Sequence, residues 1–141
     1  MSSHPVPTVA RLAESDAVSF GPLSHYNKLI GDGVLPIFTG VQTCAPGYQT
    51  ALHWHPYVEY LFVLEGVLEA WTEGEQDRPH RLGVGDMIAL PANTPHVFRN
   101  PGPGTLRLLG IHHSPARVVN RIEGATTRVA PGAPIKLNDS A

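Results

Sequence analysis

The sequence from residue 47 to residue 66 reads GYQTALHWHPYVEYLFVLEG, and it carries the features that decide the fold. Two histidines, His53 and His55, are separated by one residue, and Glu59 follows four positions later. Glycines stand at both ends of the stretch, where turns between strands are expected. Imidazole nitrogens and carboxylate oxygens bind divalent transition metals, so the stretch predicts part of a metal site built on short strands.

The spacing of these side chains indicates a bend in the chain. Residues two apart on a β-strand point to the same face, so His53 and His55 share a face and Glu59 keeps the same parity. In an unbroken strand the Cα atoms of His55 and Glu59 would lie about 13 Å apart. Metal–ligand bonds of about 2.0–2.2 Å do not reach across that separation. We therefore expect a corner at Pro56, after which Glu59 opens a second strand beside the first.

A second stretch supplies a fourth candidate ligand. Residues 85–100 read GDMIALPANTPHVFRN, and the turn between its two prolines would return His96 on a third strand. Three imidazoles and one carboxylate suit Fe, Mn, Ni or Zn, and the affinity order of these metals does not choose among them. We therefore predict one divalent transition metal ion held by His53, His55, Glu59 and His96.

The two stretches together resemble the cupin superfamily. Its first motif is Gly, five residues, His-x-His, three or four residues, Glu, six residues and Gly, and residues 47–66 match every position. Its second motif is Gly, five residues, Pro-x-Gly, two residues, His, three residues and Asn. Residues 85–100 match it except that Asn93 stands where the family has Gly, and Asn tolerates left-handed backbone well. The resemblance implies an all-β fold, the double-stranded β-helix or jelly-roll barrel of that family.

Length and composition fit one small β-rich domain. A chain of 141 residues can bury a single core, and 14 glycines with 14 prolines suit many short strands joined by turns. Charged residues make up 16% and the net charge is −2, without a basic stripe, so we expect no nucleic-acid partner. No stretch could span a bilayer and no signal-peptide core is seen, so we expect no membrane association and a cytoplasmic protein. The lone Cys44 is expected to be a small buried hydrophobe.

Turn residues divide the chain into eight or nine expected strands. We place an N-terminal arm at residues 1–16, the barrel at residues 17–123, and a C-terminal arm or disordered tail at residues 124–141. Ser114 followed by Pro115 is typical of a helix start, which predicts a short helix through about Arg121.

The strand expected at residues 58–65 is apolar on both faces. Its outward residues would be Tyr60, Phe62 and Leu64, whereas a half-exposed strand should alternate apolar and polar side chains. Such a face needs cover, from the N-terminal arm or from a second subunit. We predict a homodimer with Tyr60 and Phe62 near the interface.

The residues that would line the pocket around the metal are indicated only by the face of the strand on which they lie. Phe98 has the parity of His96 and is expected to be an apolar wall of the substrate pocket, with Leu61 from the inner face of its strand. Trp71 could line the mouth of the barrel, although core packing is the commoner role for such a residue.

No proton-transfer residue is identified by its spacing. The candidates are His112, His113, Tyr26 and Tyr48. Since His112 and His113 are adjacent on the last strand, at most one of them points inward.

Three functions are compatible with this ligand set. An octahedral ion with four protein ligands keeps two positions for water, O₂ or a bidentate substrate. The resemblance implies a small-molecule enzyme, because the superfamily includes quercetin and acireductone dioxygenases and manganese oxalate oxidases. We expect a dioxygenase acting on a chelating anionic, phenolic or enediol substrate. A non-redox isomerase or lyase, in which the ion is a Lewis acid, fits the same ligands, and a non-enzymatic small-molecule-binding cupin is the third alternative.

Overall fold

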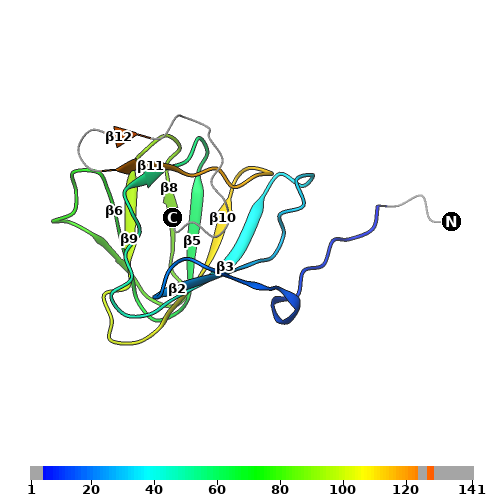
Figure 1. Ribbon diagram of the computed structural model, residues 1–141, viewed down its shortest axis with the longest axis horizontal. Helices are drawn as coiled ribbons and strands as arrows, with labels where there is room; N and C mark the ends of the chain where they lie inside the picture. The colour runs from blue at the N-terminus through cyan, green and yellow to red at the C-terminus, as the bar shows by residue number, and fades with distance from the viewer. Residues whose placement is uncertain (1–4, 124–126, 129–141) are drawn as a thin grey trace.

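Two six-stranded antiparallel sheets face each other and enclose the core of the protein (Figure 1). The computed structural model describes residues 5–123 and 127–128. The first sheet has the order β1-β2-β3-β10-β5-β8, and the second has the order β12-β11-β4-β9-β6-β7. In this part of the chain the only helix is the three-residue 3-10 turn η1, Leu12–Glu14. The predicted all-β jelly roll is confirmed.

The strands are short and their bounds follow the turn residues. The first sheet consists of β1 (Ala17–Ser19), β2 (Ser24–Lys28), β3 (Phe38–Cys44), β5 (Glu59–Glu65), β8 (Met87–Leu90) and β10 (Leu106–His112). The second sheet consists of β4 (His53–Trp54), β6 (Leu68–Thr72), β7 (His80–Leu82), β9 (His96–Arg99), β11 (Asn120–Glu123) and β12 (Thr127–Arg128). The described residues thus form twelve strands, more than the eight or nine expected, because several strands contain only two to four residues.

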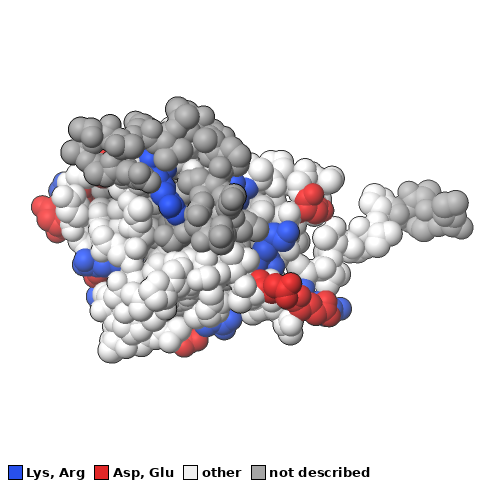
Figure 2. Space-filling model, viewed as in Figure 1, with Lys and Arg blue, Asp and Glu red and all other residues white. Residues whose placement is uncertain are grey.

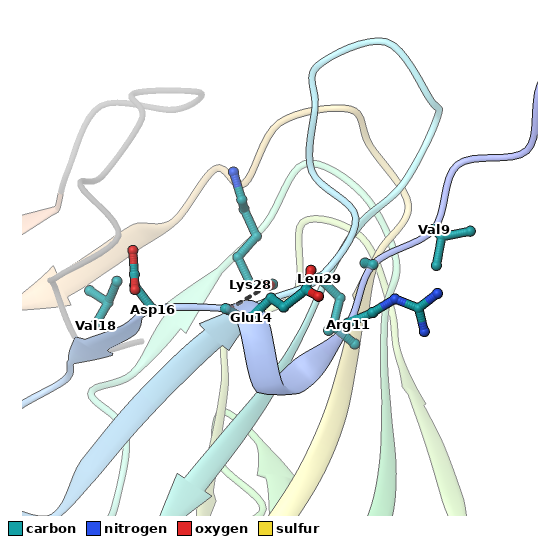
Figure 3. A pocket seen from close by; sticks show the side chains of 9 residues that line it. Val9, Arg11, Glu14, Asp16, Val18, Lys28 and Leu29 are labelled. Atoms are coloured by element: carbon teal, nitrogen blue, oxygen red, sulfur yellow. Dashed lines mark hydrogen bonds between the residues drawn. The ribbon is translucent and has the colours of Figure 1, made fainter.

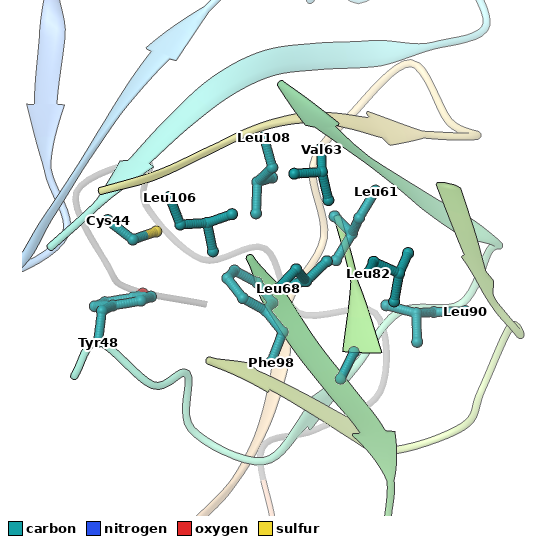
Figure 4. Packing of buried hydrophobic residues seen from close by; sticks show 11 residues of the cluster. Cys44, Tyr48, Leu61, Val63, Leu68, Leu82, Leu90, Phe98, Leu106 and Leu108 are labelled. Carbon is teal, nitrogen blue, oxygen red and sulfur yellow. The ribbon is translucent and has the colours of Figure 1, made fainter. Parts of the chain in front are cut away.

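The main core lies between the two sheets, where side chains from both approach one another (Figure 4). Leu106 from β10, Val63 from β5 and Leu68 from β6 are fully buried in it. Burying a leucine side chain contributes about 1.5–3 kcal/mol, so this cluster is a major source of stability. Burial also raises the pKa of the Cys44 thiol to about 12, which keeps it a neutral hydrophobic group, as predicted.

Strand β5 has one fully buried face. Its inward residues Glu59, Leu61 and Val63 are buried, whereas Tyr60 and Phe62 on the other face are half-buried. The inward and outward faces of this strand are therefore those that the sequence analysis assigns to these residues. The homodimer that would cover the outer face stays a prediction.

Two turn residues of the sequence motifs adopt left-handed backbone. Asn93 has φ 59°, which confirms that it takes the conformation for which the family motif has Gly, and its N–H donates to the carbonyl of His55 at 2.7 Å. Gly66 has φ 81°, and a Cβ atom there would collide with the carbonyl of Thr105. The turn at Gly66 follows β5, which begins at Glu59, and the turn at Asn93 precedes β9, which begins at His96.

The predicted helix after Ser114 is wrong. Residues 114–119 are irregular, and β11 begins at Asn120. Two side chains hold the backbone of Val118, since the Tyr57 hydroxyl accepts its N–H at 2.9 Å and His55 Nδ1 donates to its carbonyl at 2.6 Å. These bonds take the place of the backbone bonds that a helix would need.

The ends of the described chain lie outside the two sheets or at their edge. Residues 5–10 are exposed and run away from the barrel, and β12 pairs with β11 at the edge of the second sheet (Figure 1). The tail predicted for residues 124–141 lies outside the described residues except for β12. The domain bounds therefore stay predictions, although β1 begins at Ala17 and β11 ends at Glu123.

The surface carries charges of both signs. Figure 2 shows acidic and basic side chains interspersed on the visible face, without a large patch of either sign. Among the described residues, no helix is long and apolar enough to cross a lipid bilayer.

Candidate metal centre

The four candidate ligands converge inside the barrel. One donor atom from each of them lies within 4.8 Å of the others, and all four side chains are buried. His53 on β4 pairs with His96 on β9 in the second sheet, and Glu59 on β5 reaches them from the first sheet. The chain crosses from one sheet to the other at Pro56, where the sequence predicts a corner.

Backbone carbonyls fix the orientation of the three imidazoles. In each ring Nδ1 lies within hydrogen-bond distance of a carbonyl oxygen: His53 with Ala51 at 2.7 Å, His55 with Val118 at 2.6 Å, and His96 with Thr94 at 3.0 Å. A carbonyl can only accept, so each Nδ1 carries the proton and each Nε2 offers a lone pair in the neutral ring. This is the arrangement in which histidines bind metals, with the second nitrogen held by the protein.

The donor set suits a divalent transition metal ion. His96 Nε2 is buried without a hydrogen-bond partner, 3.4 Å from Glu59 Oε1. The other contact of that oxygen is His55 Nε2, at 3.2 Å. Burying unpaired nitrogen and carboxylate lone pairs is costly unless a proton or a cation compensates them. Three nitrogens and one oxygen are borderline ligands that accept Fe, Mn, Ni or Zn, so the cluster could hold a metal without selecting among these four.

The protonation states of the cluster are those that metal binding requires. Burial alone would raise the pKa of Glu59, but the surrounding imidazoles, His55 and His112 above all, hold it well below its ordinary 4.5. Burial lowers the pKa of His53 well below its ordinary 6.5, and the charges of His96 and His55 lower it further. At neutral pH the carboxylate is therefore ionised and the His53 imidazole is neutral.

His112 and Tyr57 form a hydrogen-bonded pair behind Glu59. His112 Nε2 lies 3.2 Å from Glu59 Oε2, and His112 Nδ1 lies 2.6 Å from the Tyr57 hydroxyl. Tyr57 has one hydroxyl proton, and we assign it to this shorter contact rather than to the Val118 carbonyl at 3.1 Å. His112 Nε2–H then donates to Glu59. Burial lowers the pKa of His112 to about 3, so the ring is neutral at physiological pH, whereas its neighbour His113 is exposed.

A small cavity adjoins the cluster. His53, Glu59 and His112 form part of its wall, and its free volume of about 10 Å³ admits about one water molecule. Its other lining residues are Tyr26, Gln42, Leu61, Phe98, Leu108, Gly110 and Arg117. Phe98 and Leu61 are among these lining residues, and their role as walls of a substrate pocket stays a prediction.

Two other residues considered in the sequence analysis lie elsewhere. Trp71 on β6 pairs with Val97 on β9, and Val97 points to the face of the sheet opposite to His96. The guanidinium carbon of Arg99 lies 5.1 Å from the centroid of the Trp71 ring. The assignment of Trp71 to the substrate pocket is therefore wrong, because the pairing of β6 with β9 turns it to the other face of the sheet. Tyr48 is buried in the main core against Phe98 and is not part of the described cavity wall.

Sequence reasoning missed two residues of the site. Tyr57 continues the two-residue period that begins at His53 and runs to Glu59, and this signal could have identified it. Arg117 gave no comparable signal, because its segment was expected to be helical. It is 6% exposed and lines the cavity.

A second hollow lies outside the barrel, beside η1 and β2 (Figure 3). Its volume is about 440 Å³, and its wall includes Arg11, Glu14, Asp16 and Lys28. Side chains of both signs line it, and none of the four candidate ligands does. This hollow is therefore separate from the candidate metal centre.

Comparison with known proteins identifies the family. The family model described as "Cupin domain" matches residues 40–112. The chain belongs to the cupin family. Among curated proteins, this cupin is 36% identical to protein SchB of Streptomyces halstedii over 73 residues, 51% of each chain. It is 31% identical to quercetin 2,3-dioxygenase of Bacillus subtilis (strain 168) over 96 residues, 67% of this chain and 28% of the dioxygenase. The chain thus spans about half the length of SchB and less than a third of the dioxygenase.

Solved structures share the cupin fold. The polyketide cyclase RemF of Streptomyces resistomycificus superposes with a TM-score of 0.69 at 22% identity, over 86% of this chain and 89% of RemF. KdgF of Halomonas sp. gives 0.65 at 21% identity, over 78% of this chain and 96% of KdgF. A variant of the oxalate decarboxylase OxdC of Bacillus subtilis gives 0.69 at 20% identity, over 79% of this chain and 31% of OxdC. At these identities the likeness shows the fold alone.

Proposed function

We propose that this cupin is a metal-dependent enzyme acting on a small molecule, with one divalent transition metal ion held by His53, His55, Glu59 and His96. The observation that carries the proposal is the buried convergence of three Nε2 atoms, each oriented by a carbonyl bond at Nδ1, on one ionised carboxylate. A surface histidine cluster would lack both the burial and the carbonyl anchors. An ion at this point would adjoin the small cavity, which has room for about one water molecule.

We propose that the reaction is a dioxygenation of a chelating anionic, phenolic or enediol substrate. The support is the 31% identity to quercetin 2,3-dioxygenase, over a region that includes no more than 28% of that protein. A redox-active ion, when bound, supplies a point at which substrate oxygens and O₂ meet. The chain's own contribution is to orient the ligands through the Ala51, Val118 and Thr94 carbonyls and to exclude water with apolar walls, including Phe98.

The pair formed by His112 and Tyr57 favours a second candidate, a non-redox isomerase or lyase. Such a reaction needs a group that takes up and returns a proton near the substrate. His112 lines the cavity, is neutral, and connects to the Tyr57 hydroxyl at 2.6 Å. A neutral imidazole hydrogen-bonded on both sides can accept a proton at one nitrogen while it releases one from the other.

The first experiment measures metal content and turnover together. Protein purified without added metal is analysed for Fe, Mn, Ni and Zn, and is then assayed with phenols, enediols and keto acids with and without O₂. The same measurements are made on His96→Ala and on the control His80→Ala, whose imidazole is exposed on β7. We expect about one equivalent of metal and O₂-dependent turnover in the wild type and the control, and loss of both in His96→Ala with the fold retained.

The outcomes separate the alternatives. Turnover that needs metal but not O₂ would replace the dioxygenase with the isomerase or lyase. Binding of substrates without any turnover would support a binding cupin. Full activity after removal of the ion, or an unchanged metal content in His96→Ala, would refute the metal-dependent proposal.

A further inference from the structure

Arg117 is a buried cation without an ionic partner in the described part of the chain. Its side chain is 6% exposed, and its Nη1 atom is buried without a hydrogen-bond partner. Its guanidinium makes no ion pair with the described residues and lies instead against two aromatic rings, 5.0 Å from the centroid of Phe20 and 5.8 Å from that of Tyr26. Buried guanidinium groups are normally paired with carboxylates, so this position calls for an anion that the described residues do not supply.

The charges around the cavity lead to the same requirement. Glu59 and Arg117 both line it, with formal charges of −1 and +1. Glu59 already lies 3.2–3.4 Å from the Nε2 atoms of His55, His96 and His112 and is itself a candidate ligand of the ion. With a divalent ion bound and the imidazoles neutral, the buried site would carry a net charge of about +2. A ligand with two negative charges would neutralise it.

Tyr26 offers a second donor at the same place. Its hydroxyl is buried without a hydrogen-bond partner, and its ring lines the cavity beside Arg117. Burial raises the pKa of Tyr26, so the hydroxyl keeps its proton and can donate it in a hydrogen bond. A guanidinium and a phenol that both lack acceptors form a binding site for one carboxylate group.

We propose that Arg117 and Tyr26 bind a carboxylate of the substrate while other oxygens of the same molecule chelate the ion. The proposal rests on the metal-dependent function proposed above and narrows the substrate to a carboxylic acid with a separate chelating group. The free volume of the cavity, about 10 Å³, is too small for a carboxylate with the side chains as they stand. The Arg117 side chain therefore moves on binding, which breaks no side-chain hydrogen bond with the described residues, while the backbone of Val118 stays held by Tyr57 and His55.

The test compares two ligands with the same chelating group. Lactate and malate are both α-hydroxy acids, and malate adds a second carboxylate. Their affinities for the zinc-loaded protein are measured by calorimetric titration, for the wild type, Arg117→Met, Arg117→Lys and Tyr26→Phe. Arg107→Met is the matched control, because Arg107 is at an outward-facing position of β10, away from the cavity. Methionine keeps much of the apolar volume against Phe20, and replacing a buried charge with an apolar residue is often neutral for folding.

We expect wild-type protein to bind malate about 10- to 100-fold more tightly than lactate, the contribution of a charged hydrogen-bonded pair. Arg117→Met should abolish this advantage with zinc content unchanged, Arg117→Lys should keep part of it, and Tyr26→Phe should reduce it. Arg107→Met should match the wild type. An equal preference for malate in wild type and Arg117→Met, or no preference in the wild type, would overturn the proposal. Elemental analysis before the titrations shows whether the wild-type protein takes up zinc. A protein that takes up none would refute both the proposed metal-dependent function and this inference.

Discussion

The neutral, buried His112 makes the stability of the metal-free protein depend on pH. An imidazole with an ordinary pKa of 6.5 in the unfolded chain has a pKa of about 3 in the fold, chiefly because burial disfavours its charged form. Below pH 6.5 the unfolded chain therefore binds a proton that the folded chain does not. Acid then favours unfolding, and the stabilising contribution of His112 is present above pH 6.5 and is lost as the pH falls towards 3.

The magnitude follows from the shift. A difference of 3.5 pKa units, from 6.5 to about 3, corresponds to about 5 kcal/mol across the window, at about 1.4 kcal/mol per pH unit. The pKa of His53 is also lowered in the fold, so this residue too makes the folded state less stable as the pH falls. The lowered pKa of Glu59 causes a further loss of stability below pH 4.5. Small domains have only about 5–15 kcal/mol of stability in total, so the metal-free protein should unfold in mild acid.

Urea unfolding of the chelator-treated protein between pH 7.5 and 4 measures the effect directly. In His112→Gln the titrating group is gone, while an amide can still donate to Glu59, so the fall in unfolding free energy should be shallower by about 1.4 kcal/mol per pH unit. His80→Gln removes an exposed imidazole and should keep the wild-type slope. Identical slopes for the wild type and His112→Gln would refute the argument.

Three further substitutions test the packing around the site, each by urea unfolding at pH 7.5. Tyr57→Phe removes the hydroxyl that contacts His112 and Val118 and should cost about 1–3 kcal/mol; no loss would mean that these contacts are not formed in solution. Leu106→Ala opens a cavity in the fully buried core and should cost about 2–5 kcal/mol, far more than the same change at Leu64, which is 40% exposed. Gly66→Ala should destabilise by at least about 1–2 kcal/mol, because the residue has φ 81° and its new Cβ atom would meet a backbone carbonyl; a neutral effect would contradict the described turn.

The fold and the four-ligand cluster could be predicted because their signals are local. His53 and His55 share a face by strand period alone, and Pro56 marks the corner that brings Glu59 to them. Asn93 takes the left-handed backbone that its place in the second motif requires. Each of these inferences needs only a few neighbouring residues and the stereochemistry of their backbone.

The remaining features depend on contacts between distant segments. Trp71 faces away from the cavity because of the register between β6 and β9, which the sequence does not display. The segment containing Arg117 is not helical, because Tyr57, about 60 positions earlier, holds its backbone. The proposed carboxylate site was missed for the same reason, since the sequence around Arg117 was expected to be a short helix and gave no hint that this side chain is buried.

The carbonyl anchors of the three imidazoles differ in how far they lie along the chain. His53 and His96 are each held by a carbonyl two residues upstream, so their orientation is set as soon as their own turns form. His55 is held by Val118, 63 positions downstream. A chain emerging from the ribosome therefore cannot orient all three imidazoles until the segment around Val118 has docked. Capture of the ion would then follow that docking, and a protein shortened before residue 118 should bind it loosely.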